Sequence, residues 1–342
     1  MQKSDFPLLA NHPEIIYLDN AATTQKPAIV IDGVSRFIQN DYANIHRGLY
    51  SLSENSELHY HNSKKLVSEL INCTPKEIIY TANATASFNL LAQSLVNSGF
   101  LGKGDAVLVG IRDHHANTLP WMSLAKQFGF EVRFFGLNNQ FEVNYEDFQQ
   151  KYTPEVKVVS CGQVSNVTGR IYDVKKIWSL LRKDTFFVVD ASQSVPNMPV
   201  DMKEINCDAL IFTAHKMMAY TGLGVLALKH QRVKELQPLS VGGGTIKDVS
   251  CDGFELQSNN EKFEAWTPNI IGAVSLEYAL EYLKTLSPEK TLKSSLQIIS
   301  EHEKKLAEYA LEKFHLLKEQ VKIIGPISED RVALFSFIIK GK

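Results

Sequence analysis

The sequence predicts an α/β protein with about seven strands in a mostly parallel sheet that is flanked by helices. Short apolar runs rich in β-branched residues recur along the first two thirds of the chain. Amphipathic or glycine-rich stretches separate most of these runs, and no internal repeat or low-complexity tract interrupts the alternation. Runs that are apolar at nearly every position are typical of strands buried on both faces, as in a parallel sheet covered by helices.

Seven apolar runs predict the strands of this sheet, at residues 78–81, 106–110, 132–135, 156–160, 186–190, 209–213 and 224–228. Helical periodicity predicts the covering helices, at residues 28–40, 56–71, 86–97, 119–128 and 174–181. The connection between the last two strands is too short for a helical crossover, so an antiparallel pair is predicted there.

The C-terminal part changes character. Long helices are predicted over 270–286 and 292–317, followed by short strands over 321–324 and 332–339. Three segments are therefore expected: residues 1–14 pack near a small domain, residues 15–265 form the large domain, and residues 266–342 form an incomplete, smaller α+β domain.

Bulk composition narrows the classes of function. The chain has 342 residues, a net charge of -2 and 44% hydrophobic residues, so no general attraction to nucleic acid or to an anionic membrane is expected. No apolar run approaches the roughly 20 residues that span a bilayer, and no signal-peptide core is present, which predicts a cytoplasmic protein. The four cysteines lie far apart without a CxxC pair, which favours reduced thiols over a zinc site, and no metal is expected.

Polar residues follow several predicted strands directly. Asp190 ends the run TFFVVD, Lys216 follows the run DALIFTA, His114 follows AVLVG, and Thr85 opens a helix after the strand 78–81. Ligands of open α/β sheets bind beyond the carboxyl ends of the strands, so these side chains are candidates for one site.

These residue types suit pyridoxal phosphate (PLP), which needs a lysine for a Schiff base and a carboxylate near its pyridine nitrogen. Its ring needs an aromatic or imidazole face, and its phosphate needs hydroxyls and amides at a helix N-terminus. Each residue also has a structural alternative: a strand-end aspartate can cap a turn, and a loop lysine can be solvated. The residues alone therefore indicate an α/β enzyme and leave its cofactor open.

Longer sequence motifs favour PLP as the cofactor. In these motifs the chain resembles the Suf-type cysteine desulfurase and selenocysteine lyase branch of the class V aminotransferases, which have the PLP-dependent transferase fold. The strings that carry the resemblance are YLDNAATTQKP at 17–27, NIHRG at 44–48, HHAN and PW within 114–121, SNVTG at 165–169, VDASQSVP at 189–196, HK at 215–216, TGLGVLAL at 221–228, GGGTI at 242–246 and FEAWTPN at 263–269.

The resemblance implies roles for the cofactor site. Lys216 would form the Schiff base and move the Cα proton, His114 would stack on the ring, and Asp190 would pair with the ring nitrogen. Gln193 would contact the 3-hydroxyl. The phosphate would be held by Thr85, Thr213 and His215.

It also implies a substrate site shared by a homodimer. Thr267 would reach the phosphate of the partner subunit, and His46 and Arg47 would line the entrance. Asn166 would lie beside the carboxylate of a small amino-acid substrate, L-cysteine or a similar one. The backbone of Ala21, Ala22 and Thr23 would form the wall near that carboxylate.

Several positions depart from the family pattern. The phosphate loop at 82–86 keeps one threonine and lacks the usual glycine, which is expected to weaken the phosphate site. Threonine replaces the usual serine at Thr213. Ala219 and Tyr220 replace the usual Gly-Pro after the His-Lys pair, Trp266 replaces the glycine before Thr267, and Asn197 stands where the family commonly has histidine.

The nucleophilic cysteine and the carboxylate-binding arginine of the family lie on a small-domain loop beyond the last residue of this sequence. Among the cysteines present, only Cys251 falls in a predicted loop.

Three hypotheses follow from these observations. The first is a PLP-dependent cysteine desulfurase that converts L-cysteine to alanine and passes sulfur to an acceptor protein, with activity impaired by the missing loop. The second is a PLP-dependent lyase, racemase or aminotransferase for another small amino acid. The third is a degenerate homologue that serves as a binding or scaffold protein.

Overall fold

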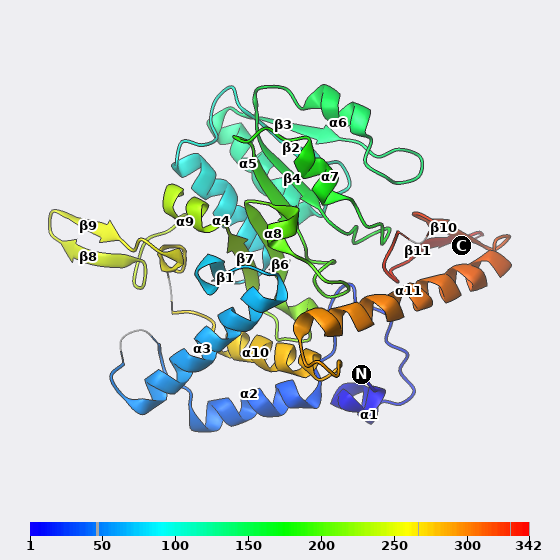
Figure 1. Ribbon diagram of the computed structural model, residues 1–342, viewed down its shortest axis with the longest axis horizontal. Coiled ribbons are helices and arrows are strands. Elements are labelled where there is room, and N and C mark those ends of the chain that lie inside the picture. Colours follow the sequence, from blue (N-terminus) through cyan, green and yellow to red (C-terminus); the bar gives the residue numbers. More distant parts are fainter. Residues whose placement is uncertain (46–47, 266, 329, 342) are drawn as a thin grey trace.

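A seven-stranded sheet forms the centre of the computed structural model, which describes residues 1–45, 48–265, 267–328 and 330–341 (Figure 1). The strand order is β1-β7-β6-β5-β4-β2-β3. The strands are β1 (Ile78–Thr81), β2 (Ala106–Gly110), β3 (Glu131–Phe135), β4 (Val156–Gly162), β5 (Phe186–Asp190), β6 (Ala209–Thr213) and β7 (Gly224–Leu228). The predicted α/β class, with a mostly parallel seven-stranded sheet, is confirmed.

Strand direction brings many chain segments to one edge of this sheet. The strands from β3 through β2, β4 and β5 to β6 pair in parallel, whereas β7 is antiparallel to both β6 and β1. The antiparallel β6–β7 pair confirms the prediction from the short connection, and the β1–β7 pair is an addition to it. The carboxyl ends of β1 to β6 and the start of β7 therefore lie at a common edge.

Two apolar cores lie on opposite faces of the sheet, because successive side chains of a strand point to opposite sides. In β5, Phe186 and Val188 join one core, while Phe187 and Val189 join the other. A fully buried side chain of this size contributes about 1.5–3 kcal/mol. The two helical layers therefore fix the sheet from both sides.

Each core has its own helices. The first face is covered by α4 (Ala84–Asn97), α5 (His115–Phe128) and α9 (His230–Glu235). The second face is covered by α2 (Ala28–Asn40), α3 (Ser51–Leu70), α6 (Tyr145–Lys151), α7 (Val174–Ser179), α8 (Met202–Ile205) and α10 (Ile270–Lys284). No helix within the described residues is both long and apolar enough to cross a membrane.

Helix α5 begins earlier than predicted. It starts at His115 and not at 119, because the ring of His114 caps it by accepting a hydrogen bond from the amide of Ala116 at 3.1 Å. Histidine is outside the usual set of capping residues, and Pro120 lies inside the helix. The apolar periodicity therefore marked only the part of α5 that follows its first turn.

The predicted strand over 332–339 was wrong in its first half. Only β11 (Ser336–Ile339) pairs with β10 (Val321–Ile324). The residues before β11 bond to a different part of the chain, because Arg331 bridges to Arg170 and the amide of Val332 donates to the carbonyl of Gly169 at 3.0 Å.

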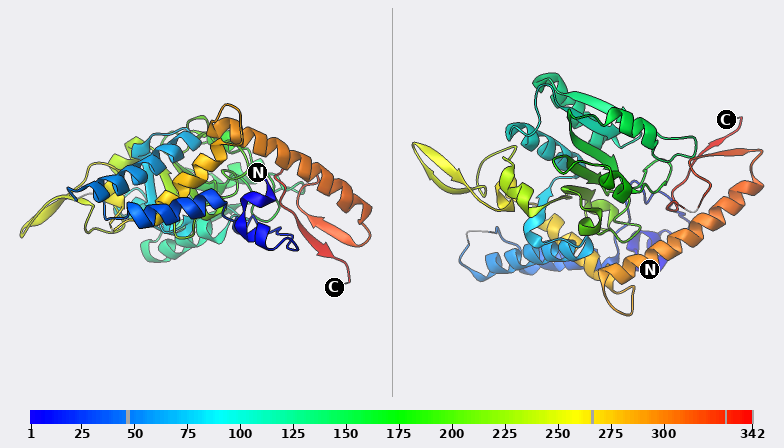
Figure 2. Two further views of the ribbon diagram at one scale, coloured as in Figure 1. Left: turned by 90° about the horizontal axis from the view of Figure 1, so that it is seen from below. Right: turned by 45° about the horizontal axis from the view of Figure 1, so that its top comes forward.

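Two peripheral features project from opposite ends of the molecule (Figure 2). One is a hairpin that was not predicted, made of β8 (Ile246–Ser250) and β9 (Gly253–Leu256). The other is α11 (Leu292–Leu316) with the β10–β11 pair.

The short α1 (Pro7–Asn11) follows Asp5, which accepts a 2.7 Å hydrogen bond from Tyr282 of α10. The domain limits 1–14, 15–265 and 266–342 stay a prediction.

Candidate active site

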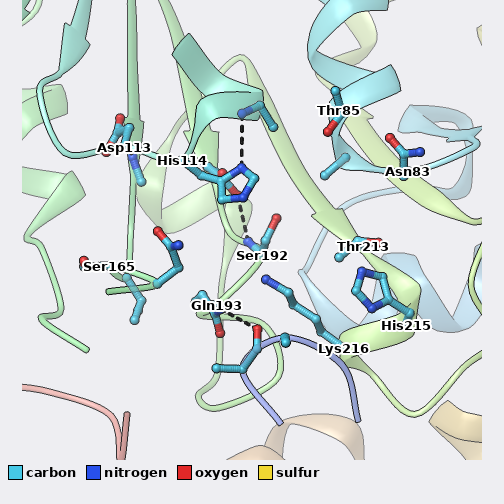
Figure 3. A pocket seen from close by; sticks show the side chains of 18 of the residues that line it. Asn83, Thr85, Asp113, His114, Ser165, Ser192, Gln193, Thr213, His215 and Lys216 are labelled. Carbon is cyan, nitrogen blue, oxygen red and sulfur yellow. Dashed lines mark hydrogen bonds between the residues drawn. The ribbon is translucent and has the colours of Figure 1, made fainter. Parts of the chain in front are cut away.

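A pocket of about 450 Å³ opens at the edge where the strands end (Figure 3). Its walls come from the residues that follow β1, β2, β4, β5 and β6, together with the segment at residues 19–22. Side chains that are far apart in the sequence therefore face one space. This is the position in which open α/β sheets bind their ligands.

Lys216 lies at the end of a short 3-10 helix, η3 (Ala214–Lys216), directly after β6. The amide of Ala214 donates to the carbonyl of Leu223 at 3.0 Å, which fixes the turn to the start of β7. The side chain is half-buried and extends into the pocket (Figure 3). Burial lowers the pKa of Lys216, and the negative charge of Asp190 partly opposes this shift. The neutral amine is therefore more accessible than in a solvated lysine.

Asp190 is the last residue of β5 and is 9% exposed. Its Oδ1 accepts a hydrogen bond from the amide of Ser192 at 2.9 Å, which holds the carboxylate at the pocket wall. Gln193, which follows Ser192 in the sequence, is buried. Its Nε2 donates to the carbonyl of Ala21 at 2.8 Å, so it ties the segment at 19–22 to the sheet (Figure 3).

His114 presents its ring to the pocket from the N-terminus of α5 (Figure 3). Its Nδ1 accepts the amide of Ala116, and this bond requires an unprotonated Nδ1. Burial also lowers the pKa of His114, although the charge of Asp190 opposes that effect. A neutral, oriented imidazole is the result.

Asp113 packs its carboxylate into the ends of β2 and β4. Its Oδ2 accepts from the amide of Gly162 at 3.1 Å and from Nδ2 of Asn117 at 3.0 Å. A Cβ at Gly110 would lie 2.8 Å from Oδ1 of Asp113, so a side chain there would displace the carboxylate. Burial raises the pKa of Asp113 to about 7. The hydrogen bonds of Asp113 to Gly162 and Asn117 fix the loop that carries His114.

A polar corner of the pocket surrounds the N-terminus of α4. Asn83 caps the helix by accepting the amide of Ala86 at 2.9 Å, and Thr85 lies in the first turn at the pocket wall. The first amides of a helix have no partner within it, and they favour anions. A Cβ at Gly224 would lie 2.3 Å from the carbonyl carbon of Asn83, so only glycine lets β7 pass so close behind this corner.

Two further residues of the corner come from the end of β6. Thr213 and His215 both line the pocket. Nδ1 of His215 lies 3.1 Å from Oγ1 of Thr23, and the amide of Thr24 donates to the carbonyl of His215 at 3.2 Å. The segment that contains Ala21, Ala22 and Thr23 is therefore bound to the same loop as Lys216.

Most of the residues predicted for the site line this one pocket, namely Lys216, His114, Thr85, Asp190, Gln193, Thr213, His215, Ala22 and Asn166. Thr267 is exposed and does not line it. His46, Arg47 and Trp266 lie outside the described residues. The individual roles of all these residues stay predictions.

The sequence reasoning missed several residues of the pocket wall, namely Asp19, Arg112, Asp113, Ser165 and Ser192. Each one lies within two residues of a string that carried the family resemblance or belongs to such a string. Their proximity to strand ends was the available signal.

The four cysteines differ in exposure: two are buried, Cys73 is partly buried and Cys251 is exposed. Cys161 and Cys207 are buried, and burial raises the pKa of Cys207 to about 12 and that of Cys161 well above its ordinary value. Cys251 is exposed in the turn of the β8–β9 hairpin. None of the described residues that line the pocket is a cysteine. The described residues also contain no group of three or more side chains placed to hold a metal ion.

The fold and this pocket agree with the comparison to known proteins. The Aminotransferase class-V family matches residues 16–342, so the chain belongs to that family. Its relatives are more specifically cysteine desulfurases. Proteins named "Probable cysteine desulfurase" from Borreliella burgdorferi and Synechocystis are 32% and 35% identical to it, over 99% of this chain and 80% of each relative.

A solved structure is also similar to this chain over nearly its whole length. The apo structure of a cysteine desulfurase from Thermococcus onnurineus NA1 superposes with a TM-score of 0.91 at 33% identity. It covers 99% of this chain, and this chain covers 82% of it.

Class V aminotransferases and cysteine desulfurases depend on PLP. The pocket fits this cofactor in its chemistry, since it holds a primary amine, a carboxylate, an imidazole and a helix N-terminus. These are the groups that an aldehyde, a protonated pyridine, an aromatic ring and a phosphate require.

Proposed function

We propose that this protein is a PLP-dependent cysteine desulfurase in which Lys216 holds the cofactor. The observation that carries the proposal is the meeting of Lys216, Asp190 and His114 at one pocket beside the N-terminus of α4. When bound, PLP supplies an electron sink next to the Cα of an amino acid. The cysteine desulfurases among the relatives support L-cysteine as the substrate.

The residues of the chain have separate tasks in this proposal. Lys216 bonds to the cofactor aldehyde and moves the proton at the substrate Cα, which its lowered pKa favours. Asp190 would keep the pyridine nitrogen of the bound cofactor protonated, and the neutral ring of His114 would pack against the cofactor ring. The amides at the start of α4, with Thr85, Thr213 and His215, hold the phosphate. Asn166 and the backbone of Ala22 contact the substrate.

The overall reaction conserves its atoms and electrons. The C–S bond of L-cysteine breaks, the carbon skeleton leaves as L-alanine with a proton added at Cβ, and the sulfur joins an acceptor thiol to give a persulfide. We place the final acceptor on a partner protein. The thiolate form of a cysteine is the nucleophile in such a transfer.

A second candidate is a lyase, racemase or aminotransferase reaction on another small amino acid. Burial raises the pKa of Cys161 and of Cys207, which disfavours the thiolate form of both. Reactions that need no protein thiol would use the same lysine, carboxylate and imidazole.

The proposal includes a homodimer with shared sites. Apolar side chains are exposed around α2 and α3, including Leu49 at 98% and Leu58 at 59%, which fits a surface that pairs with a second copy. Thr267 is exposed and is available to reach a neighbouring subunit. The four free cysteines suit the reducing cytoplasm, where we place the protein.

The experiment is an absorbance spectrum of the purified protein, recorded after addition of PLP and again after addition of L-cysteine. A band from lysine-bound cofactor that changes with L-cysteine supports the proposal, with alanine as a product and with sulfide released from the persulfide when a dithiol reductant such as dithiothreitol is present. Keto acid from other amino acids would identify an aminotransferase. A protein that binds PLP and leaves every amino acid of a panel unchanged would be a non-catalytic binding or scaffold protein.

A further inference from the structure

We propose that Thr24 is a positioning residue for Lys216, because its hydroxyl group bonds to the backbone on both sides of the lysine and aims the amine into the pocket. The inference rests on the proposed function and deepens it, since it concerns how the amine is presented to the cofactor. Thr24 does not line the pocket, so it acts through the loop that carries Lys216 and not by contact with a ligand.

The hydroxyl of Thr24 makes two hydrogen bonds to this loop. Its Oγ1 donates to the carbonyl of His215 at 3.0 Å. The same atom accepts the amide of Met218 at 2.8 Å. A hydroxyl has one proton to donate and lone pairs that accept, so both bonds form at once. They reach the residue before Lys216 and the second residue after it, and therefore bracket the lysine.

The hydrogen bond within the loop uses other backbone groups. The short η3 closes with the amide of Met217, which donates to the carbonyl of Ala214 at 2.8 Å. The carbonyl of His215 and the amide of Met218 turn instead to the hydroxyl of Thr24. Met218 is buried, so loss of the partner of its amide is costly.

Met218 also has a backbone conformation that needs support. Its φ is 63°, in the left-handed region that residues other than glycine rarely adopt. Such a conformation persists where the surrounding contacts hold it. The bond from its amide to Thr24 is one of these contacts, and the packing of Met217 and Met218 in the core is another. The turn that follows Lys216 therefore depends in part on Thr24.

The neighbours of Thr24 hold the carbonyl that precedes Lys216. The amide of Thr24 donates to the carbonyl of His215 at 3.2 Å, and Oγ1 of Thr23 donates to it at 3.3 Å. Nζ of Lys26 donates to the carbonyl of Thr24 and, at 3.5 Å, to that of His215. Thr24 differs from these neighbours because its hydroxyl also reaches the far side of the lysine, at the amide of Met218.

The bracketed backbone determines where the amine of Lys216 lies. The side chain is half-buried and extends into the pocket (Figure 3). Burial lowers the pKa of the amine, so this position also increases the neutral, nucleophilic fraction. An amine held close to the aldehyde reacts faster than one that must first find its orientation. Loss of the Thr24 hydroxyl lets the loop relax and the amine move toward solvent.

The test compares Thr24→Val, which keeps the shape and loses the hydroxyl, with Thr24→Ser, which keeps the hydroxyl. Thr24→Ala is a second variant without the hydroxyl. The matched control is Thr285→Val, because the hydroxyl of Thr285 donates to the carbonyl of Tyr282 at 2.7 Å and Thr285 does not line the pocket. Stopped-flow absorbance measures the rate at which saturating PLP attaches to the cofactor-free protein. Calorimetry measures the Kd of pyridoxine phosphate, which has no aldehyde and reports the rest of the pocket.

A further readout needs no cofactor. Competitive labelling with acetic anhydride, followed by peptide mass spectrometry, gives the pH midpoint at which Lys216 of the cofactor-free protein becomes reactive. The ionisable groups that interact electrostatically with Lys216, namely Asp190, His114 and His215, are unchanged in every variant. A difference in midpoint therefore reports a change in the position of the amine.

Loss of one buried hydrogen bond corresponds to roughly a tenfold effect. We expect Thr24→Val and Thr24→Ala to slow PLP attachment by about that factor. The labelling midpoint should rise toward the ordinary lysine value of about 10.4, since the amine becomes more solvated. The Kd of pyridoxine phosphate should stay unchanged. Thr24→Ser should keep most of the wild-type rate, and Thr285→Val should match the wild type in every measurement.

An unchanged attachment rate in Thr24→Val would overturn the assignment. Equal weakening of pyridoxine phosphate binding would also overturn it, because the hydroxyl would then support the pocket as a whole. The proposed function fails separately if the wild-type protein attaches PLP and forms no alanine from L-cysteine, or attaches no PLP. In the latter event the labelling midpoints decide, and equal midpoints in Thr24→Val and the wild type would reject a positioning role.

Discussion

At the scale of single residues, burial and charge act in opposite directions on Lys216. Burial lowers the pKa of its amine, and the nearby carboxylate of Asp190 limits that decrease. A lysine nucleophile must be neutral, so a lower pKa increases its reactive fraction at neutral pH. In the proposed function the same carboxylate would also pair with the cofactor nitrogen.

The pH dependence of cofactor attachment tests this account. Below its pKa the amine is protonated and cannot attack the aldehyde, so the rate should rise with pH and level off above the pKa. We expect the midpoint to lie below the ordinary lysine value of about 10.4. Stopped-flow absorbance with cofactor-free protein measures the rate, and a midpoint at or above the ordinary value would contradict the expected effect of burial.

Asp190→Asn should separate cofactor binding from turnover. The amide keeps the shape of the side chain but loses the charge that stabilises a protonated pyridine. We expect the cofactor band to remain and kcat to fall by about 10- to 100-fold, the effect of one charge-assisted hydrogen bond. Steady-state alanine formation measures kcat. Asp184→Asn, which changes an exposed residue before β5, is the control and should keep full activity.

The residues predicted from the sequence were those whose type and strand-end position are both distinctive. Lys216, Asp190 and His114 follow strands that are easily recognised, and the structure brings them to one pocket. Arg112 and Asp113 follow the same strand as His114 but were missed. The orientation of these two side chains depends on contacts with Phe141 and Gly162, which are distant in the sequence, so a local sequence pattern does not reveal it.

At the scale of elements, one buried acid joins a helix, a strand and the segment that leads to Thr267. Oε1 of Glu264 accepts from Nζ of Lys64 on α3 at 2.9 Å and from the amide of Tyr80 on β1 at 2.7 Å. Its Oε2 accepts from the hydroxyl of Tyr60 at 2.8 Å. Because every contact is buried, the charge of Glu264 depends on these partners for its stability.

Removing the cation from this cluster should be costly. Lys64→Met leaves Glu264 buried without its counter-charge, and we expect the free energy of unfolding to fall by about 3–5 kcal/mol. Urea titration followed by circular dichroism measures the change. Lys65→Met alters the adjacent, exposed residue and should stay within about 0.5 kcal/mol of the wild type. Equal stabilities of the two variants would show that the ion pair contributes nothing.

Element types were predictable where apolar periodicity extends over the whole element. The residues of α2, β5, β6 and β7 match their predicted ranges, because burial on fixed faces dictates the sequence there. The β8–β9 hairpin was missed because most of its side chains are exposed, so the strands have no buried face to produce an apolar alternation. Residues 332–335 were assigned to a strand on composition, but their pairing partner lies in the loop near Gly169.

At the scale of the whole molecule, the site is a consequence of strand direction. Parallel strands deliver their following loops to one edge, and β7 enters from that edge because it runs in the opposite direction. The sequence predicts seven strands, but the spatial order with β7 between β1 and β6 is determined by contacts across the sheet. The pocket therefore depends on long-range pairing that local patterns do not contain.

Association of two subunits is the prediction at this scale. Leu58 on α3 is 59% exposed among other apolar side chains, so a charge there should oppose a dimer that buries this surface. Leu58→Glu should shift the protein from dimer to monomer in analytical ultracentrifugation at micromolar concentration. Leu316→Glu changes a residue that is 72% exposed at the end of α11 and should leave the dimer intact. A wild-type protein that sediments as a monomer would reject the shared-site arrangement.

The most direct measurement of the central claim is borohydride reduction of the PLP-treated protein, followed by peptide mass spectrometry. Reduction converts the C=N bond between the cofactor and its lysine to a stable C–N bond, which marks the residue that carried PLP. The account predicts one pyridoxyl group on the peptide that contains Lys216, and its loss in Lys216→Ala. A label on a different lysine, or an equal label in Lys216→Ala, would contradict the account.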